Sequence, residues 1–207
     1  MYKLFGYKGC GSTAIEALLE LMALPYEGVQ LEWAKARDWD ELKRWNPLGQ
    51  VPTLVTSEGQ VLTESAAIIL WLLDRHPDTA LMPASGSAAR PAFYRWLVFI
   101  SANISAAIII GDFPERWVEG EAAQASLKEK SAARTKVCWQ MMESAMSPAP
   151  WLLGDTLTAL DIYVAMVSRW RPPGRVWFEE HCPKVAGAIR LTERHPVVAS
   201  VWARNFG

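Results

Sequence analysis

The feature that most constrains the fold is a change of pattern near Pro77. Before it, short strand-like runs alternate with segments of helical periodicity, and after it only helical segments remain. The expected order over residues 1–77 is strand, helix, strand, helix, strand, strand, helix. Residues 78–89 contain Pro83, Ser85, Gly86 and Ser87 among small residues, which is typical of a linker. We therefore expect an α/β domain at 1–77, a linker at 78–89 and an all-helical domain at 90–207.

Local signals locate several elements of the first domain. Apolar residues at i, i+3, i+4 and i+7 predict a first helix, and the spacing of Thr13 and Glu16 predicts a capping box that starts it at Thr13. A strand, helix, strand unit of this length implies a right-handed parallel pair. Residues 53–56 and 60–63 predict an antiparallel hairpin, because a short turn with a glycine joins them.

The second part of the chain predicts long helices. Residues 90–110 have apolar residues on more than one face, so this helix is expected to be largely buried. Residues 119–146 predict a second helix. Thr158 and Asp161 have capping-box spacing before a third, and one or two more are expected within 183–202.

Composition excludes several classes of protein. The 207 residues are 51% hydrophobic, and 21 Lys and Arg balance 22 Asp and Glu to a formal charge of -1. That balance argues against disorder and against a nucleic-acid partner. The longest apolar stretch, Leu97–Ile110, is interrupted by polar residues and falls short of the roughly 18–20 residues that a bilayer requires. No secretory signal is evident, so we expect a soluble, cytoplasmic protein without a membrane partner.

The cysteines predict no disulfide framework and no metal site. Cys10, Cys138 and Cys182 are far apart, and the three histidines form no zinc template with them. Cys10 lies between two glycines at an expected helix start, a setting that favours a reactive thiolate and admits a ligand backbone. The alternative is that Cys10 is an inert small hydrophobe. The other two cysteines lack this setting and are expected to be structural.

A motif in the first domain carries a resemblance. Residues 46–54 read Asn-Pro-Leu-Gly-Gln-Val-Pro-Thr-Leu, and Thr-Glu-Ser follows at 63–65. Together with the order of elements, the linker and the stretch 154–161, this motif resembles the cytosolic glutathione transferases over almost the whole chain. The resemblance implies a thioredoxin-like N-terminal domain, an all-α C-terminal domain, a homodimer, and glutathione as co-substrate without a metal.

The resemblance also implies where glutathione binds. A cis Val51-Pro52 bond would turn a peptide edge outward, so that Val51 pairs with the backbone of the tripeptide as an added strand does. Ser65, at a helix start, would seat the γ-glutamyl carboxylate on free N–H groups, and Glu64 would take its ammonium. Taken alone, Ser65 would be an ordinary N-cap. Lys35 would pair with the glycyl carboxylate, or would be a solvated surface lysine.

The reacting sulfur is expected at the turn of residues 7–13. A helix N-terminus gives up to about 2 kcal/mol toward a nearby thiolate, and one charge-assisted hydrogen bond a comparable amount. In the family the activating residue here is Tyr, Ser or Cys. This chain offers Cys10, placed like the cysteine of bacterial beta-class enzymes, with Ser12 and Tyr7 as alternatives. Thr13 and Ser12 could instead only cap the helix.

The electrophile would lie against the first long helix. Trp96, Phe99 and Asn103 are about one helical turn apart, and with Tyr7 they are candidates to line a site for a small hydrophobic electrophile. Ala106 or Ala107 would continue that wall. The alternative is that these residues are the core of the bundle.

Three functions remain open. The first is a glutathione transferase that activates the thiol of glutathione for attack on the electrophile. The second is a glutathione-dependent thiol transferase in which Cys10 forms a mixed disulfide. The third is a glutathione-binding module without catalysis. The turn lacks the Ser-Ser-Cys-Ser-x-Arg pattern of zeta-class isomerases, so maleylacetoacetate isomerisation is not supported. It also lacks a second cysteine at thioredoxin spacing, so a dithiol disulfide reductase is not supported.

Overall fold

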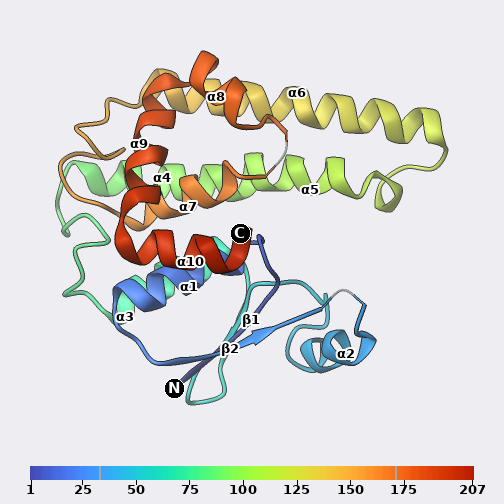
Figure 1. The fold of residues 1–207 in the computed structure, drawn as a ribbon, viewed down its shortest axis with the longest axis horizontal. Helices are drawn as coiled ribbons and strands as arrows, with labels where there is room; N and C mark the ends of the chain where they lie inside the picture. The colour runs from blue at the N-terminus through green and yellow to red at the C-terminus, as the bar shows by residue number, and fades with distance from the viewer. Residues whose placement is uncertain (33, 171) are drawn as a thin grey trace. The chain divides into compact units, whose positions relative to one another are not determined.

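The chain forms two compact units in the computed structural model, which describes residues 1–32, 34–170 and 172–207 (Figure 1). The first unit comprises Met1–Met82 together with Thr192–Gly207, and the second comprises Pro83–Leu191. The predicted boundaries at 1–77, 78–89 and 90–207 differ from this division chiefly at the C-terminus. The last helix was expected in the helical domain, but it belongs to the first unit because it packs on the first helix.

The first unit has the predicted order of elements and the sheet of a thioredoxin-like domain. Its four strands lie in the order β2-β1-β3-β4, with β1 parallel to β2 and antiparallel to β3, so the predicted parallel pair and hairpin are confirmed. Its elements are β1 (Tyr2–Gly6), α1 (Ser12–Leu21), β2 (Tyr26–Gln30), α2 (Ala36–Trp45), β3 (Thr53–Val55), β4 (Val61–Leu62), α3 (Ser65–Arg75) and α10 (Pro196–Phe206).

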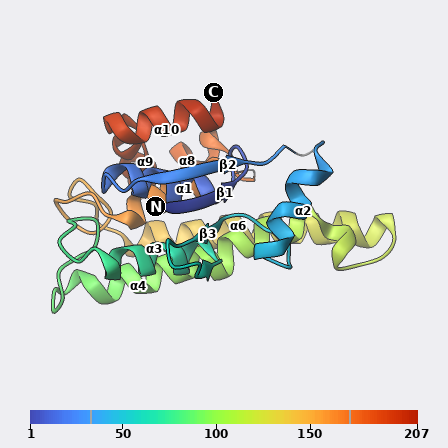
Figure 2. The ribbon, with the colours of Figure 1, turned by 90° about the horizontal axis from the view of Figure 1, so that it is seen from below.

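Both faces of this sheet are covered. Successive side chains of a strand point to opposite faces, and in β1 both Leu4 and Phe5 are buried. Phe5 packs with Leu31, Leu42 and Val55 in a cluster to which α2 contributes Leu42. α1 packs on β1 and against α3, and β1 and β2 run side by side (Figure 2). Each large apolar side chain buried here contributes about 1.5–3 kcal/mol.

The first helix begins differently from the prediction. α1 starts at Ser12 with Gly11 as its N-cap, and no side chain caps it. The hydroxyl of Thr13 is buried without a hydrogen-bond partner, and the carboxylate of Glu16 is bound by α10 instead. The predicted capping box of Thr13 and Glu16 is therefore wrong, because tertiary packing uses the carboxylate that the cap would need.

A buried carboxylate fastens α10 to α1, and the two helices lie side by side (Figure 1). Glu16 Oε1 accepts hydrogen bonds from Arg204 Nε at 3.2 Å and Nη2 at 2.8 Å, and its Oε2 accepts one from Asn205 Nδ2 at 2.9 Å. The Glu16 side chain is only 9% exposed. A carboxylate buried to this extent is stable only with such hydrogen-bond partners, and α10 supplies them to Glu16 of α1.

The named elements of the second unit are all helical in its described residues, and one isolated bridge joins Trp151 and Gly154. Its predicted long helix is one continuous helix of 24 residues, Ala89–Asp112, with a π-helical segment in the middle that the sequence did not reveal. A short helix, α8, was also not predicted. The elements are α4 (Ala89–Phe99), the π segment η1 (Ile100–Ser105), α5 (Ala106–Asp112), the 3-10 turn η2 (Pro114–Arg116), α6 (Glu121–Ala145), α7 (Ala159–Val167), α8 (Arg175–His181) and α9 (Pro183–Arg194), whose last residues belong to the first unit.

The predicted capping box of α7 is confirmed. Asp161 Oδ2 accepts hydrogen bonds from Thr158 N at 2.9 Å and Thr158 Oγ1 at 2.7 Å, and Oδ1 accepts one from Leu152 N at 2.8 Å. Burial raises the pKa of Asp161, and these hydrogen bonds oppose that rise. The box therefore fixes both the start of α7 and the loop that precedes it.

The helix Ala89–Asp112 is long and apolar enough to cross a membrane by length and composition alone. In the second unit α4 contacts α7, and α5 lies along α6 (Figure 1). A Cβ built on Gly111 would lie 3.3 Å from Ser131 Cβ, so a glycine lets α5 and α6 approach closely. These contacts are typical of a core helix in a helical bundle. Such a helix can be as long and as apolar as one that crosses a membrane.

The bond between α1 and α10 makes a prediction for stability. Arg204→Met leaves the buried Glu16 carboxylate with Asn205 as its remaining partner, so we expect the free energy of unfolding to fall by about 2–3 kcal/mol. Arg190→Met is the matched control: both arginines are 46% exposed, but Glu179, the partner of Arg190, is 43% exposed. Its loss should be below about 0.5 kcal/mol. Urea unfolding measures both, and equal losses would contradict the buried role of Glu16.

Candidate functional site

Three segments far apart in the sequence meet at the N-terminal end of α1. A Cβ built on Gly11 would lie 3.0 Å from Cδ of Pro52 and 3.8 Å from Cβ of Ser65. The turn before α1, the loop before β3 and the start of α3 are therefore neighbours. Because the first N–H groups of a helix have no intrahelical acceptor, two helix N-termini, those of α1 and α3, approach one point.

Cys10 lies in the turn just before α1. Its N–H donates to the carbonyl of Tyr7 at 3.2 Å, and its own carbonyl accepts from Thr13 N at 3.0 Å. Its Sγ lies 3.2 Å from Ser12 Oγ, a distance at which either atom can donate. The backbone of the turn thus holds the thiol at the helix start.

Of the three cysteines, Cys10 alone is accessible. Cys138 and Cys182 are buried, whereas Cys10 is partly exposed. Burial and the nearby Glu143 raise the pKa of Cys182 to about 12, and burial also raises the pKa of Cys138. A deprotonated thiol is the nucleophilic form, so thiolate chemistry in this chain falls to Cys10.

Ser12 lies beneath the turn and not at its surface. The residue is 1% exposed, and its hydroxyl donates to Tyr7 O at 3.4 Å besides contacting Cys10. A Cβ built on Gly6 would lie 2.5 Å from Ser12 Oγ, so the strand makes room for this hydroxyl. The alternative that Ser12 caps α1 is wrong, because no side chain caps that helix.

The loop before β3 carries the predicted cis Val51-Pro52 bond. Buried Asn46 braces this loop: its Nδ2 donates to Gln50 O at 2.9 Å and to Thr53 Oγ1 at 3.2 Å, and its Oδ1 accepts from Leu48 N at 3.1 Å. Asn46 stands first in the sequence motif, but its supporting role was not predicted. The available signal was an Asn just before a proline-containing turn, where amide side chains bond loop backbone.

The start of α3 has an unusual backbone conformation. Glu64 is its N-cap with φ 63°, in the left-handed region, and Ser65 is its first helical residue. The alternative that Ser65 is the N-cap is therefore wrong by one position. Among the described non-glycine residues, only Ala23 shares a positive φ. Such conformations cost about 1–3 kcal/mol and concentrate at functional sites. The Glu64 side chain is exposed, and its carboxylate has no partner among the described residues.

Lys35 and Tyr7 lie at the edge of the turn region. Lys35, one residue before α2, is exposed and pairs with Glu32, whose hydrogen bond raises the pKa of Lys35. The ring of Tyr7 lies 6.5 Å from that of Trp39 on α2, and Trp39 Nε1 donates to Glu32 O at 3.1 Å. Trp39 was not predicted to have a role. The assignment of Lys35 to the glycyl carboxylate stays a prediction.

The candidate electrophile residues lie on the long helix of the second unit. Trp96 is buried, and its ring meets that of Phe99 edge-on at 5.1 Å. Asn103, in the π segment, donates from Nδ2 to Phe99 O at 3.3 Å, and its Oδ1 accepts from Arg134 Nη2 at 3.0 Å. Their role toward an electrophile stays a prediction, and Arg134 was not predicted.

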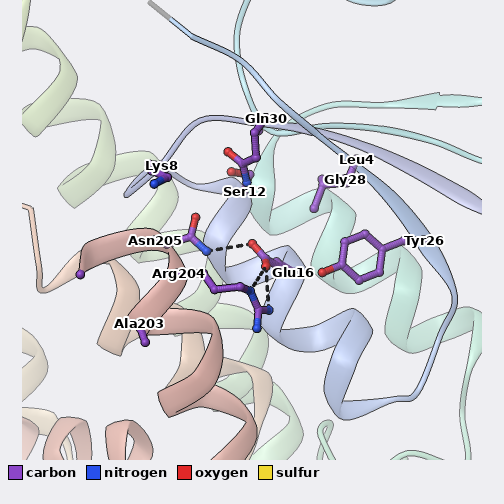
Figure 3. A pocket seen from close by; sticks show the side chains of 12 residues that line it. Leu4, Lys8, Ser12, Glu16, Tyr26, Gly28, Gln30, Ala203, Arg204 and Asn205 are labelled. Atoms are coloured by element: carbon purple, nitrogen blue, oxygen red, sulfur yellow. Dashed lines mark hydrogen bonds and ion pairs between the residues drawn. The ribbon is translucent and has the colours of Figure 1, made fainter.

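A cavity of about 790 Å³ lies on the other side of α1, over the sheet face that includes Gly6 and Gly28. Figure 3 shows Glu16 of α1 and two residues of α10, Arg204 and Asn205, pointing toward one another across it. Tyr26 donates to Glu20 at 3.1 Å, and burial, with the nearby Glu16 and Glu20, raises the pKa of its hydroxyl. Cys10, Pro52 and Ser65 do not line this cavity.

The described residues contain no group of three or more His, Cys, Asp or Glu side chains that could hold a metal ion. The polar atoms at the end of α1 are thiol, hydroxyl and backbone groups. Such groups can form hydrogen bonds with a peptide backbone and can stabilise a thiolate.

Comparison with known proteins identifies the family. Residues 12–75 match the glutathione S-transferase N-terminal domain. Over 207 residues the chain is 34% identical to the GST-like protein YncG of Escherichia coli strain K12, covering 99% of this chain and 98% of that protein. The chain belongs to the glutathione transferase family.

Further relatives agree with this membership. The chain is 29% identical over 173 residues to glutathione S-transferase GstA of Escherichia coli O157:H7, covering 81% of each chain. A glutathione transferase homologue from Sulfitobacter, solved with bound glutathione, has a TM-score of 0.84 over 99% of this chain and 98% of that one. At 21% identity this structure shows a shared fold.

The packing around Ser12 leads to a second prediction. Gly6→Ala places a methyl group 2.5 Å from Ser12 Oγ, so we expect the free energy of unfolding to fall by about 1–3 kcal/mol through overpacking. Gly28→Ala is the control on the paired strand, since its nearest atom is 3.6 Å away. Thermal and urea unfolding compare the two variants. A Gly6→Ala protein as stable as Gly28→Ala would show that Ser12 is not held against β1.

Proposed function

We propose that the protein is a glutathione transferase that activates the thiol of glutathione for attack on a small hydrophobic electrophile. The observation that carries this proposal is the meeting of the Cys10–Gly11 turn with Pro52 and Ser65 at the start of α1. Family membership and a relative named glutathione S-transferase support it. Each of the three segments offers a different group to one tripeptide.

The tripeptide backbone pairs with Val51 in this proposal, as an added strand would. The γ-glutamyl carboxylate sits on the N–H groups at Ser65, where the positive end of the α3 dipole favours an anion. The exposed carboxylate of Glu64 takes the ammonium of the same group, and Lys35 takes the glycyl carboxylate. The left-handed backbone conformation of Glu64 supports this assignment, because energetically unfavourable conformations of this kind concentrate at functional sites.

The sulfur of glutathione lies beside Cys10 at the N-terminus of α1. The Cys10 thiol donates a hydrogen bond to the glutathione thiolate, and the helix dipole stabilises the same charge. The thiolate then attacks the electrophilic carbon: a carbon–sulfur bond forms, and the leaving group departs with its bonding electrons. The predicted role of Tyr7 in electrophile binding, and that of Trp96, Phe99 and Asn103, belong to the same proposal.

A second candidate function is favoured by the accessibility of Cys10. In a thiol transferase, the Cys10 thiolate attacks a glutathionylated substrate, forming a mixed disulfide and releasing the substrate thiol. A second glutathione thiolate then attacks that disulfide, which releases oxidised glutathione and restores Cys10. This route needs the Cys10 sulfur as nucleophile, whereas the transferase needs only its hydrogen bond.

A cytoplasmic location, a homodimer and a role in detoxification belong to the same proposal, because the resemblance implies them. Sedimentation of the full chain measures the assembly. A monomer at micromolar concentration would remove the homodimer from the proposal.

The conformation of Glu64 makes a third prediction. Glu64→Gly relieves the left-handed backbone, so we expect stability within about 0.5 kcal/mol of the wild type or above it, while glutathione affinity falls at least about tenfold. Ala23→Gly is the matched control, with φ 52° just after α1. It should leave glutathione affinity unchanged. Calorimetric titration with glutathione decides, and wild-type affinity in Glu64→Gly would remove Glu64 from the site.

Turnover tests the proposed reaction. With glutathione and 1-chloro-2,4-dinitrobenzene, we expect measurable turnover and a fall in kcat/KM of about ten- to a hundredfold in Cys10→Ala, since one hydrogen bond to a charged group is lost. Cys138→Ala, which removes a buried thiol, is the control. Addition of one glutathione to Cys10 by oxidised glutathione, detected by intact mass, would favour the thiol transferase. A protein that shows neither glutathione binding nor turnover would overturn both functions.

A further inference from the structure

We infer that Ser12 is a positioning residue that sets the direction of the Cys10 proton, and that it acts through Cys10 without touching glutathione. The inference deepens the proposed function and rests on it for its catalytic consequence. It comes from three atoms in a row: Cys10 Sγ lies 3.2 Å from Ser12 Oγ, which lies 3.4 Å from Tyr7 O. Ser12 is 1% exposed, so its hydroxyl is kept from solvent.

The same heavy atoms support two hydrogen-bond arrangements, because a hydroxyl has one proton to donate and two lone pairs. In the inward arrangement Ser12 donates to Tyr7 O, and the Cys10 thiol donates to Ser12 Oγ. In the outward arrangement Ser12 donates to Cys10 Sγ, so the Cys10 proton, or the lone pair of its thiolate, faces away from Ser12. No covalent bond changes between the two, apart from any proton that Cys10 itself loses to solvent.

The outward arrangement prevails when negative charge is present on sulfur. A hydrogen bond to a charged acceptor is roughly twice as strong as one between neutral groups. The contact that must be given up, Ser12 to Tyr7 O at 3.4 Å, is long for an O–H···O bond, whose usual range is about 2.5–3.0 Å. Turning the hydroxyl toward Cys10 therefore costs little and stabilises either a Cys10 thiolate or a Cys10 thiol that donates to glutathione.

Nothing else in the described chain can do this for Cys10. Ser12 Oγ is the one described polar atom within hydrogen-bonding reach of Cys10 Sγ. Arg204 pairs with both Glu16 and Glu20, and Glu16 and Arg204 line the cavity that Ser12 borders, where Lys8 also lies (Figure 3). The titratable and charged groups on the elements around the pair are Tyr7 and Lys8 of the turn, Glu16 and Glu20 of α1, Tyr26 of β2, Glu64 at the start of α3 and Arg204 of α10.

The hydroxyl cannot easily move away. Gly6 leaves the space that Ser12 fills, and the first turn of α1 fixes its backbone. Thr13, the next residue, offers an internal comparison: its hydroxyl is also buried, but it has no hydrogen-bond partner. Two hydroxyls of one helical turn therefore differ in whether they reach the thiol.

The experiment measures alkylation of Cys10 by iodoacetamide against pH, with the labelled peptide quantified by mass spectrometry in the full chain. In Ser12→Ala we expect alkylation at pH 7 to slow about tenfold and the pH–rate profile to move up by about one pH unit, with the high-pH rate unchanged. Thr13→Val, which removes the unpartnered hydroxyl, should keep the wild-type profile. Ser12→Thr keeps the hydroxyl and should also show the wild-type pH–rate profile.

A merely structural role would lower stability without moving the pH profile, so circular dichroism and the Tm are recorded for each variant. An unchanged profile in folded Ser12→Ala overturns the inference, as does an equal displacement in Thr13→Val. Should Ser12→Ala fail to fold, a wild-type profile in folded Ser12→Thr supports the inference, and a displaced one overturns it. Alkylation needs no glutathione, so a protein that neither binds glutathione nor turns over ends the proposed function while this measurement still decides the role of Ser12.

Discussion

The N-terminal end of α1 receives two other segments only because position 11 has no side chain. A methyl group there would lie 3.0 Å from Pro52, which is tighter than nine in ten real contacts of a Cβ atom. Pro52, and with it the loop before β3, would have to move by a few tenths of an ångström, whereas Ser65 at 3.8 Å would be in ordinary contact. The N-terminal ends of two helices and one partly exposed thiol are brought together by this contact. Every assignment made to glutathione depends on it.

The turn that carries Cys10 is held from behind as well. Gly9 has φ 74°, and a Cβ built on it would lie 3.4 Å from the ring of Phe206 and 3.7 Å from the carbonyl of Asn205. The C-terminal helix therefore supports the turn directly, besides binding Glu16 of α1. These contacts explain why α10 belongs to the first unit, with α1, α2 and α3, and not to the second unit with the other C-terminal helices.

Local sequence signals recovered the parts of the fold that depend on neighbours in the chain. The hairpin after Thr53, the start of α3 to within one residue, and the capping box of Thr158 follow from spacings of two to four residues. The same reasoning failed at Thr13 and Glu16, where the capping pattern is present but a partner nearly 190 residues away takes the carboxylate. A spacing rule has no access to such a partner.

The candidate site was predictable to the extent that it is written in contiguous motifs. Cys10, Val51 and Ser65 were named from short patterns, and the structure places the segments that carry them beside one another. The supporting groups were not foreseen, because their roles arise from folding: Asn46 becomes a brace only once its loop closes, and the π segment that carries Asn103 leaves no periodic signal. The burial of Ser12 depends likewise on Gly6 in the adjacent strand.

Helical geometry explains how one turn of α1 can serve two purposes. Residues four apart share a helix face, so Ser12 and Glu16 both point to the sheet and to α10, where both are buried. Gly11, the N-cap, faces Pro52 and Ser65 instead, and Cys10 precedes it with its sulfur still partly exposed. Glu16 on the inner face is bound by Arg204, which also pairs with Glu20, and the described side chain that reaches the thiol is the neutral Ser12. A neutral donor responds to charge on sulfur without adding charge of its own, which suits the proposed function, in which the outer face of the turn binds an anionic peptide.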